Sequence, residues 1–300
     1  AVMGALVSFP LLGDNQYNVN TEVELSQKNS YRIKNDQEMA QNKQTARFKL
    51  TASPSANSTI TLIARSEFDQ YYDKGRFDSS AVSEHRADSD LREGYADIYF
   101  DNFSLRLGKQ QVTWGESDYF RTLDVINSLD LRDFLLPYVE DFQEARNTLN
   151  MANLMYQGDV WEAQLLYIPD FEENRLASVD ADFAASELVE LSAQLGLPSE
   201  HRPDTGFDNA AWGMNTKGTF DWGELGLYAY SGWNSEGTLS LSGIEPQFTY
   251  HRRKFVGLSF SRPVGAWVLR SDLAYRINER LSPQLTSGLD YVEHDVSELL

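Results

Sequence analysis

Apolar and polar residues alternate along most of this chain with a repeat of two. In segment 60–68, "ITLIARSEF", the apolar residues fall mainly at alternate positions, and Arg65 and Glu67 lie between them. This repeat is typical of strands with two unlike faces. It predicts an all-β protein of eleven strands, with a twelfth near 288–295. Besides 60–68, the pattern is clearest in nine of these segments, at 18–26, 46–52, 92–100, 105–113, 161–167, 211–220, 225–233, 255–260 and 267–276.

The connections between these segments alternate in length. The short ones contain Pro, Gly, Asn or Asp, which favour tight turns, and fall at 53–58, 101–102, 158–159, 221–223 and 263–265. The long ones fall at 27–45, 69–91, 115–149, 168–209 and 235–247. In a soluble β-sandwich, nothing favours placing all the long loops at one end. Short periplasmic turns and long outer loops are typical of a transmembrane, antiparallel outer-membrane β-barrel, which we therefore predict, with short helices in its outer loops.

In such a barrel the apolar face of each strand contacts lipid and the polar face lines the lumen. Aromatic residues near strand ends suit the two interfacial girdles. Opposite charges on the polar face either form a ladder that selects a substrate or pair with each other. Their near balance favours pairing. The predicted pore-lining residues are Arg65, Glu67, Glu93, Asp97, Arg106, Arg270, Asp272 and Arg276.

Length and composition limit the other possibilities. We expect one barrel domain over 1–300, with 12 or more strands. Because the chain ends in "VSELL" without the usual terminal aromatic residue, we expect closing strands to be missing. The N-terminal "AVMGALVSFPLLG" is either a signal remnant, an added segment or part of the fold. The net charge of -19 argues against nucleic acid as a partner, and zero Cys excludes disulfides and thiolate metal sites.

Two long connections have features of their own. Segment 115–149 is predicted to fold inward as a pore constriction, since a long ordered loop is usually functional. Trp114 is expected to reach the outer interface, Gly115 to let the chain turn, and Glu116 to face the pore mouth. Segment 168–209 is a long outer loop with an amphipathic helix at 183–198, which either captures hydrophobic molecules or, as we expect, packs on the barrel rim. Its acidic residues suit divalent cations that bridge lipopolysaccharide.

The stretch "RLGKQQVTWGESDYFRTLDVINSLDLRDFL" resembles a family of Gram-negative outer-membrane β-barrels of unknown function, often encoded beside RND-type transporters. Ser128 stands where that family usually has Pro. A looser similarity extends to alginate-export and porin-type barrels. The resemblance implies the outer membrane, a transport role, and a periplasmic or RND-type partner. It is carried by Gly108, Lys109, Gln110, Trp114, Gly115, Glu116, Ser117, Asp124, Val125, Asn127, Asp130 and Leu131.

No catalytic, cofactor or metal site is predicted. The four histidines are scattered, and Ser66 and Ser117 lack a convincing catalytic partner. Glu116, Asp118 and Asp124 are interpreted as a solvated acidic rim rather than a calcium site.

The predicted function is passage of a small organic or lipid-like molecule across the outer membrane, with membrane lipid and lipopolysaccharide as surroundings. A lipid hydrolase built on a barrel and a plugged structural partner of an inner-membrane exporter are the alternatives.

Overall fold

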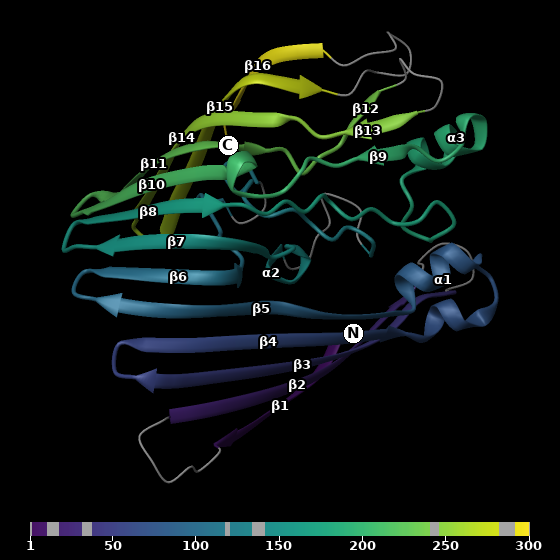
Figure 1. The fold of residues 1–300 in the computed structure, drawn as a ribbon, viewed down its shortest axis with the longest axis horizontal. Coiled ribbons are helices and arrows are strands. Elements are labelled where there is room, and N and C mark those ends of the chain that lie inside the picture. The colour runs from purple at the N-terminus through teal and green to yellow at the C-terminus, as the bar shows by residue number, and fades with distance from the viewer. Residues whose placement is uncertain are drawn as a thin grey trace. The chain divides into compact units, whose positions relative to one another are not determined.

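In the computed structural model, residues 2–10, 18–31, 38–117, 121–133, 142–240, 246–281 and 292–299 are described. The fold is all-β, with short helices in the long connections (Figure 1). The chain divides into two compact units, each considered by itself. The first holds Ala1–Ile98, Asp130–Glu140 and Arg175–Glu190, and the second holds Tyr99–Leu129, Asp141–Asn174 and Leu191–Leu300.

The first unit is built on a run of antiparallel strands in chain order. Within the N-terminal segment, residues 2–10 pair with residues 20–28, so this part of the segment belongs to the fold. The long connection between β4 and β5 holds η1 (Gln70–Lys74) and α1 (Ser79–His85). The strands are β1 (Val2–Pro10), β2 (Asn18–Tyr31), β3 (Met39–Ser55), β4 (Ser58–Asp69) and β5 (Ala87–Phe100).

The second unit holds a longer antiparallel run, a small side sheet and three short helical segments. The side sheet joins β12 (Thr238–Ser240), β13 (Gln247–Thr249) and β9 (Ser199–His201). The helical segments are α2 (Phe142–Ala145), the C-terminal half of α3 (Ser186–Leu195) and η2 (Phe207–Asn209). The strands of the main run are β6 (Phe103–Gln110), β7 (Leu149–Gln157), β8 (Trp161–Ile168), β10 (Ala211–Phe220), β11 (Gly223–Trp233), β14 (Arg252–Val264), β15 (Trp267–Leu281) and β16 (Val292–Leu299).

The predicted short turns are confirmed, because all five connect strands that are adjacent in the chain. The expectation of 12 or more strands is confirmed, since the described ranges alone place thirteen strands in the two runs. One predicted connection was wrong. Residues 27–31 and 39–45 are strand, because their polar residues continue the β2–β3 register, as in the Gln27–Gln44 pair. The expected strand near 288–295 is present as β16 from Val292 onward, and residues 288–291 lie outside the described residues.

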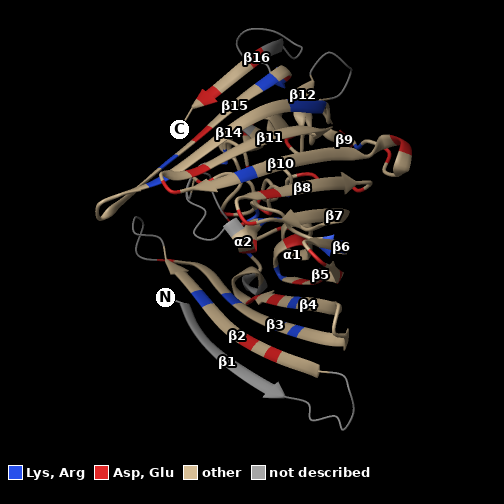
Figure 2. Cartoon of the chain, turned by 90° about the vertical axis from the view of Figure 1, so that its left-hand side faces the viewer, with Lys and Arg blue, Asp and Glu red and all other residues tan. Residues whose placement is uncertain are grey.

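The strands expose their apolar face and bury their polar one. On β4, Ile60 and Leu62 are both 40% exposed, whereas the intervening Thr61 is 5% exposed and Arg65 is 8% exposed. On β15, Leu273 and Tyr275 are exposed beside Asp272, which is 1% exposed. Figure 2 shows bands of charge along β2, β3 and β4. This is the reverse of a soluble sheet. In each unit we call the face with the buried polar side chains the inner face.

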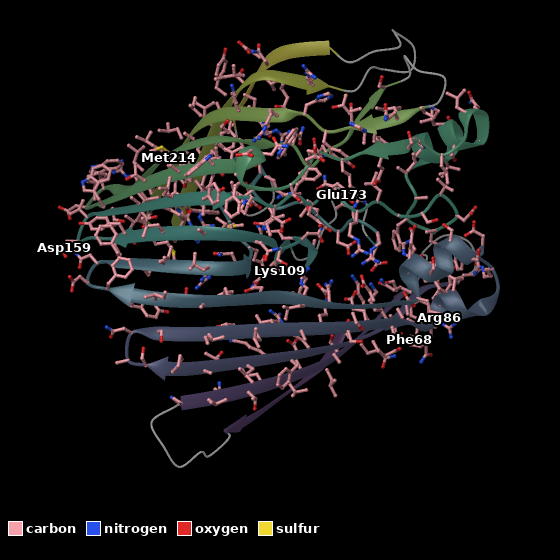
Figure 3. All side chains as sticks on the ribbon, viewed as in Figure 1. Phe68, Arg86, Lys109, Asp159, Glu173 and Met214 are labelled. Atoms are coloured by element: carbon pink, nitrogen blue, oxygen red, sulfur yellow. The ribbon has the colours of Figure 1, made fainter. Side chains whose placement is uncertain are left out.

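The outer face is aromatic near the short turns of the second unit. Phe220 stacks on Trp222 with ring centroids 5.1 Å apart and also contacts Trp161 at 5.5 Å. On the outer face of β10, Met214 is 55% exposed (Figure 3). Among helices within the described ranges, none is both long and apolar enough to cross a membrane.

Candidate functional site

The WGES segment leaves the end of β6 and lies on the inner face of the second unit. Trp114 is 3% exposed, and its Nε1 donates to Gln164 Oε1 at 2.7 Å. Its ring also packs against Tyr228 and Phe255, from β11 and β14. The prediction that Trp114 reaches the outer interface is therefore wrong. Its indole fills space beside the inner face because the chain bends inward after the strand ends.

Asp272 holds the turn that follows Trp114. Gly115 has φ +89°, and a Cβ there would lie 2.6 Å from Asp272 Oδ2, so the turn needs glycine. The backbone N–H groups of Glu116 and Ser117 donate to the Asp272 carboxylate at 3.0–3.1 Å. Lys217 Nζ lies 2.8 Å from Glu116 Oε1. We call Glu116, Ser117, Lys217 and Asp272 the loop anchor.

The remainder of this loop is stabilised by its own buried polar groups. Asp124 is 5% exposed and accepts hydrogen bonds from Arg121 and Arg146 at 2.7–3.1 Å. Asn127 is fully buried; its Oδ1 accepts from the N–H of Val112 at 2.8 Å, and its Nδ2 donates to a backbone carbonyl. The interpretation of Asp124 as part of a solvated rim is wrong, because two guanidinium groups enclose it. Asp118 lies outside the described residues.

Two glycines make room for the loop on the inner face. Leu123 is fully buried and belongs, with Trp114, to a hydrophobic cluster that also includes strand residues of the second unit. A Cβ at Gly257 on β14 would lie 2.2 Å from Leu123 Cδ2, and one at Gly213 on β10 would lie 2.8 Å from Trp114 Cη2. The loop therefore fits into positions that carry no side chain.

A chain of side-chain amides crosses four strands beneath the loop. Asn153 Nδ2 donates to Gln110 Oε1 at 3.1 Å, and Gln164 Nε2 donates to Asn153 Oδ1 at 3.1 Å. Asn215 Nδ2 donates to Gln164 Oε1 at 2.8 Å. Our sequence analysis missed these residues as a site. Their signal is polar amides at inner-face positions of β6, β7, β8 and β10.

In the first unit, residues 130–133 pair with charged residues on the inner face. Arg132 Nη2 lies 2.6 Å from both Asp130 Oδ2 and Asp88 Oδ2, and Arg175 Nη1 lies 3.1 Å from Asp88 Oδ2. Burial raises the pKa of Asp130, but the hydrogen bond and charge of Arg132, with the charge of Arg175, outweigh it and hold that pKa below its usual value. Asp130 is thus part of an ionic network.

A second group of charges lies beside this network. Lys43 forms ion pairs with Asp133 and with Glu67, the latter at 3.5 Å. Burial raises the pKa of Asp133, but the His85 ring, whose Nδ1 lies 3.8 Å from Asp133 Oδ1, and the charge of Lys43 lower it well below its usual range. Arg65 pairs with Asp90 at 3.2 Å and with Glu67 at 3.7 Å. The inner face of this unit therefore combines both signs of charge.

The other predicted pore-lining residues vary in burial. Glu93 and Asp97 are buried, Arg106 is half-buried, and Arg270 is exposed. Arg276 is half-buried and pairs with Glu298 at 2.8 Å. The ion pairs of Arg65, Glu67 and Arg276 agree with mutual pairing of charges, and the pore-lining role stays a prediction.

The predicted helix of segment 183–198 is present as α3 (Ser186–Leu195). Its Leu191 is 6% exposed and its Leu195 is 54% exposed, so the helix has one packed side. Within the described residues, no group of three or more His, Asp or Glu side chains is placed to hold a metal ion.

The chain is similar to solved structures of other proteins. OccK2 (OpdF) of Pseudomonas aeruginosa, solved in complex with glucuronate, is similar at 10% identity and a TM-score of 0.44 over 99% of this chain, which spans 60% of OccK2. Salmonella typhi OmpF, solved in complex with daunomycin, gives 10% identity and a TM-score of 0.34 over 97% of this chain and 82% of OmpF. No curated protein matches. The family model described as "Protein of unknown function (DUF1302)" matches residues 3–293, and the chain belongs to that family.

Proposed function

We propose that the chain forms a transmembrane β-barrel of the Gram-negative outer membrane and passes a small organic or lipid-like molecule. The path is a charged lumen narrowed by the inward-folded loop, and passage involves no covalent chemistry. One observation carries this proposal: the same strands that expose Leu, Ile and Trp bury Arg, Glu and Asp. Lipid is the solvent that favours such an arrangement.

The outer face supports contact with lipid. Trp212, Met214 and Leu227 are each at least 50% exposed on neighbouring strands β10 and β11. Burial of apolar surface away from water stabilises by about 25 cal/mol per Å². A monomer in water would forgo that free energy over its whole outer face, whereas lipid supplies it.

The inner face supports a narrowed path. In the second unit, the loop anchor and the cluster around Leu123 hold residues 112–117 and 121–126 against the strands. In the first unit, residues 130–133 pair with Lys43 and Asp88. A solute that moves along these faces meets both signs of charge at each place, which suits a polar or amphipathic molecule better than a simple ion.

The test is single-channel conductance of the purified chain in planar bilayers, for wild type, Asp272→Asn and the control Asp221→Asn. Asp272→Asn removes the negative charge that accepts two backbone hydrogen bonds, so the loop is released more often. We expect low conductance in wild type and in Asp221→Asn, and higher or more frequent openings in Asp272→Asn. Silence of all three proteins, once each is shown to be folded and inserted, refutes the proposal.

The dense packing of the loop favours one second candidate. With Trp114, Leu123 and Asn127 almost or fully buried, the loop resembles a fixed plug as much as a gate. The chain would then be a structural partner of a periplasmic or RND-type exporter. This candidate predicts silence in wild type and Asp272→Asn, together with retained binding to the exporter.

A further inference from the structure

A polar cavity of about 160 Å³ lies in the second unit beside the end of β15 that is remote from the short turns. It is bounded by β14, β15, β16 and the segment before β12. Its charged lining consists of Arg253, Arg276, Arg280, Glu236 and Glu279. Three arginines against two glutamates leave the lining with one net positive charge.

A bulge in β15 gathers these side chains. Arg276 pairs with Val296 and Glu279 with His294, so β15 has one extra residue relative to β16. Asn278 lies in this bulge with φ +51°, a conformation that asparagine tolerates better than most residues. Its N–H donates to Asp295 at 2.9 Å. The interrupted alternation lets Arg276, Glu279 and Arg280 line the same cavity.

Two buried polar atoms of the lining residues have no hydrogen-bond partner within the described part of the chain. They are Nε of Arg276, a donor, and Oε2 of Glu279, an acceptor. The neighbouring atoms are engaged: Glu279 Oε1 accepts from Arg253 and from Asn234 at 3.2 Å, and Arg276 Nη2 pairs with Glu298. Since burial without a partner is costly for either atom, a ligand that satisfies both is favoured.

We propose that this cavity binds small carboxylates that carry a neighbouring hydroxyl group. The carboxylate accepts from Arg276 Nε, and the hydroxyl donates to Glu279 Oε2. A carboxylate without the hydroxyl leaves Glu279 Oε2 unpaired, and an amine is repelled by the arginines. This binding site goes beyond the proposed passage function, because a ligand can bind there at equilibrium whether or not the chain conducts.

The test compares glycolate with acetate, which lacks the hydroxyl, as sodium salts at equal ionic strength. Binding to the purified chain in detergent micelles is measured by ligand-observed NMR titration. We expect saturable binding with glycolate about tenfold tighter, the size of one hydrogen bond to a charged group. Equal affinities, or no saturable glycolate binding by the folded protein, overturn the proposal.

Variants locate the site. Glu279→Gln is expected to remove most of the preference for glycolate over acetate, and Arg276→Met to weaken both ligands. Arg262→Met, at the other end of β14, is the control and is expected to change neither. An unchanged preference in folded Glu279→Gln overturns the assignment. If either variant fails to fold, the wild-type comparison still decides. If the bilayer recordings detect no conductance, the NMR titration can still detect ligand binding. The two proposals are therefore tested separately.

Discussion

The substitution Gly257→Ala tests whether the loop lies on the inner face as described. The added Cβ would lie 2.2 Å from Leu123 Cδ2. Ordinary carbon–carbon contact needs about 3.5–4.0 Å, so Leu123 or the strand must move by more than about 1 Å. Leu123 is fully buried and has little room to move. We expect destabilisation of about 1–3 kcal/mol, the usual cost of overpacking.

The assay is urea unfolding of the protein in micelles, followed by tryptophan fluorescence. Leu123→Ala alone is expected to lower the free energy of unfolding by about 2–5 kcal/mol. The double variant Gly257→Ala/Leu123→Ala removes the clash. Its decrease in unfolding free energy is therefore expected to be smaller, by about 1 kcal/mol or more, than the sum of the decreases in the two single variants.

Gly94→Ala is the matched strand control, because its Cβ would meet only the flexible ends of exposed Leu91 and Leu62. It is expected to be neutral or slightly stabilising. An unchanged stability in Gly257→Ala, or strict additivity with Leu123→Ala, would refute the placement of Leu123 against Gly257.

Three further outcomes follow. Asp272→Ala leaves two backbone N–H groups without their acceptor, and we expect faster protease cleavage of the loop than in wild type, measured by mass spectrometry. Trp114→Phe keeps an aromatic ring but leaves Gln164 without its indole donor; we expect a loss of about 1–3 kcal/mol in urea unfolding. The folded-state pKa of Asp130 lies below its ordinary 3.8. Its pairing therefore stabilises above about pH 4 and is lost as the pH falls further. Arg132→Met removes the main group that lowers this pKa, so the decrease in melting temperature below about pH 4 is expected to be smaller than in wild type; an equally large decrease would contradict the pairing.

The faces of the strands were predictable because a strand turns every second side chain to the same side. Ile60 and Leu62 share the exposed face of β4, and Arg65 lies opposite, as alternation requires. The short turns were predictable for a similar reason, since their residues favour reversal locally. The extent of β2 and β3 was not predictable from hydrophobicity, because their ends pair through polar residues such as Gln27 and Gln44.

The candidate site was predictable only in part. The sequence marked Trp114, Gly115 and Glu116 as a break after a strand, and Gly115 does make the turn. It placed Trp114 at the outer interface because an aromatic at a strand end usually lies there. The choice between outside and inside depends on Gly213, Tyr228 and Phe255, which are distant in sequence.

By itself the sequence determined the all-β class, the two unlike faces and the alternation of short and long connections, because each depends on neighbours within a few residues. Only the tertiary structure decided that Asp272 accepts the N–H groups of Glu116 and Ser117, that Gly257 makes room for Leu123, and which partners pair with the buried charges. The physical reason is that these contacts join residues far beyond the reach of local sequence, and their geometry exists only after the strands have paired in register.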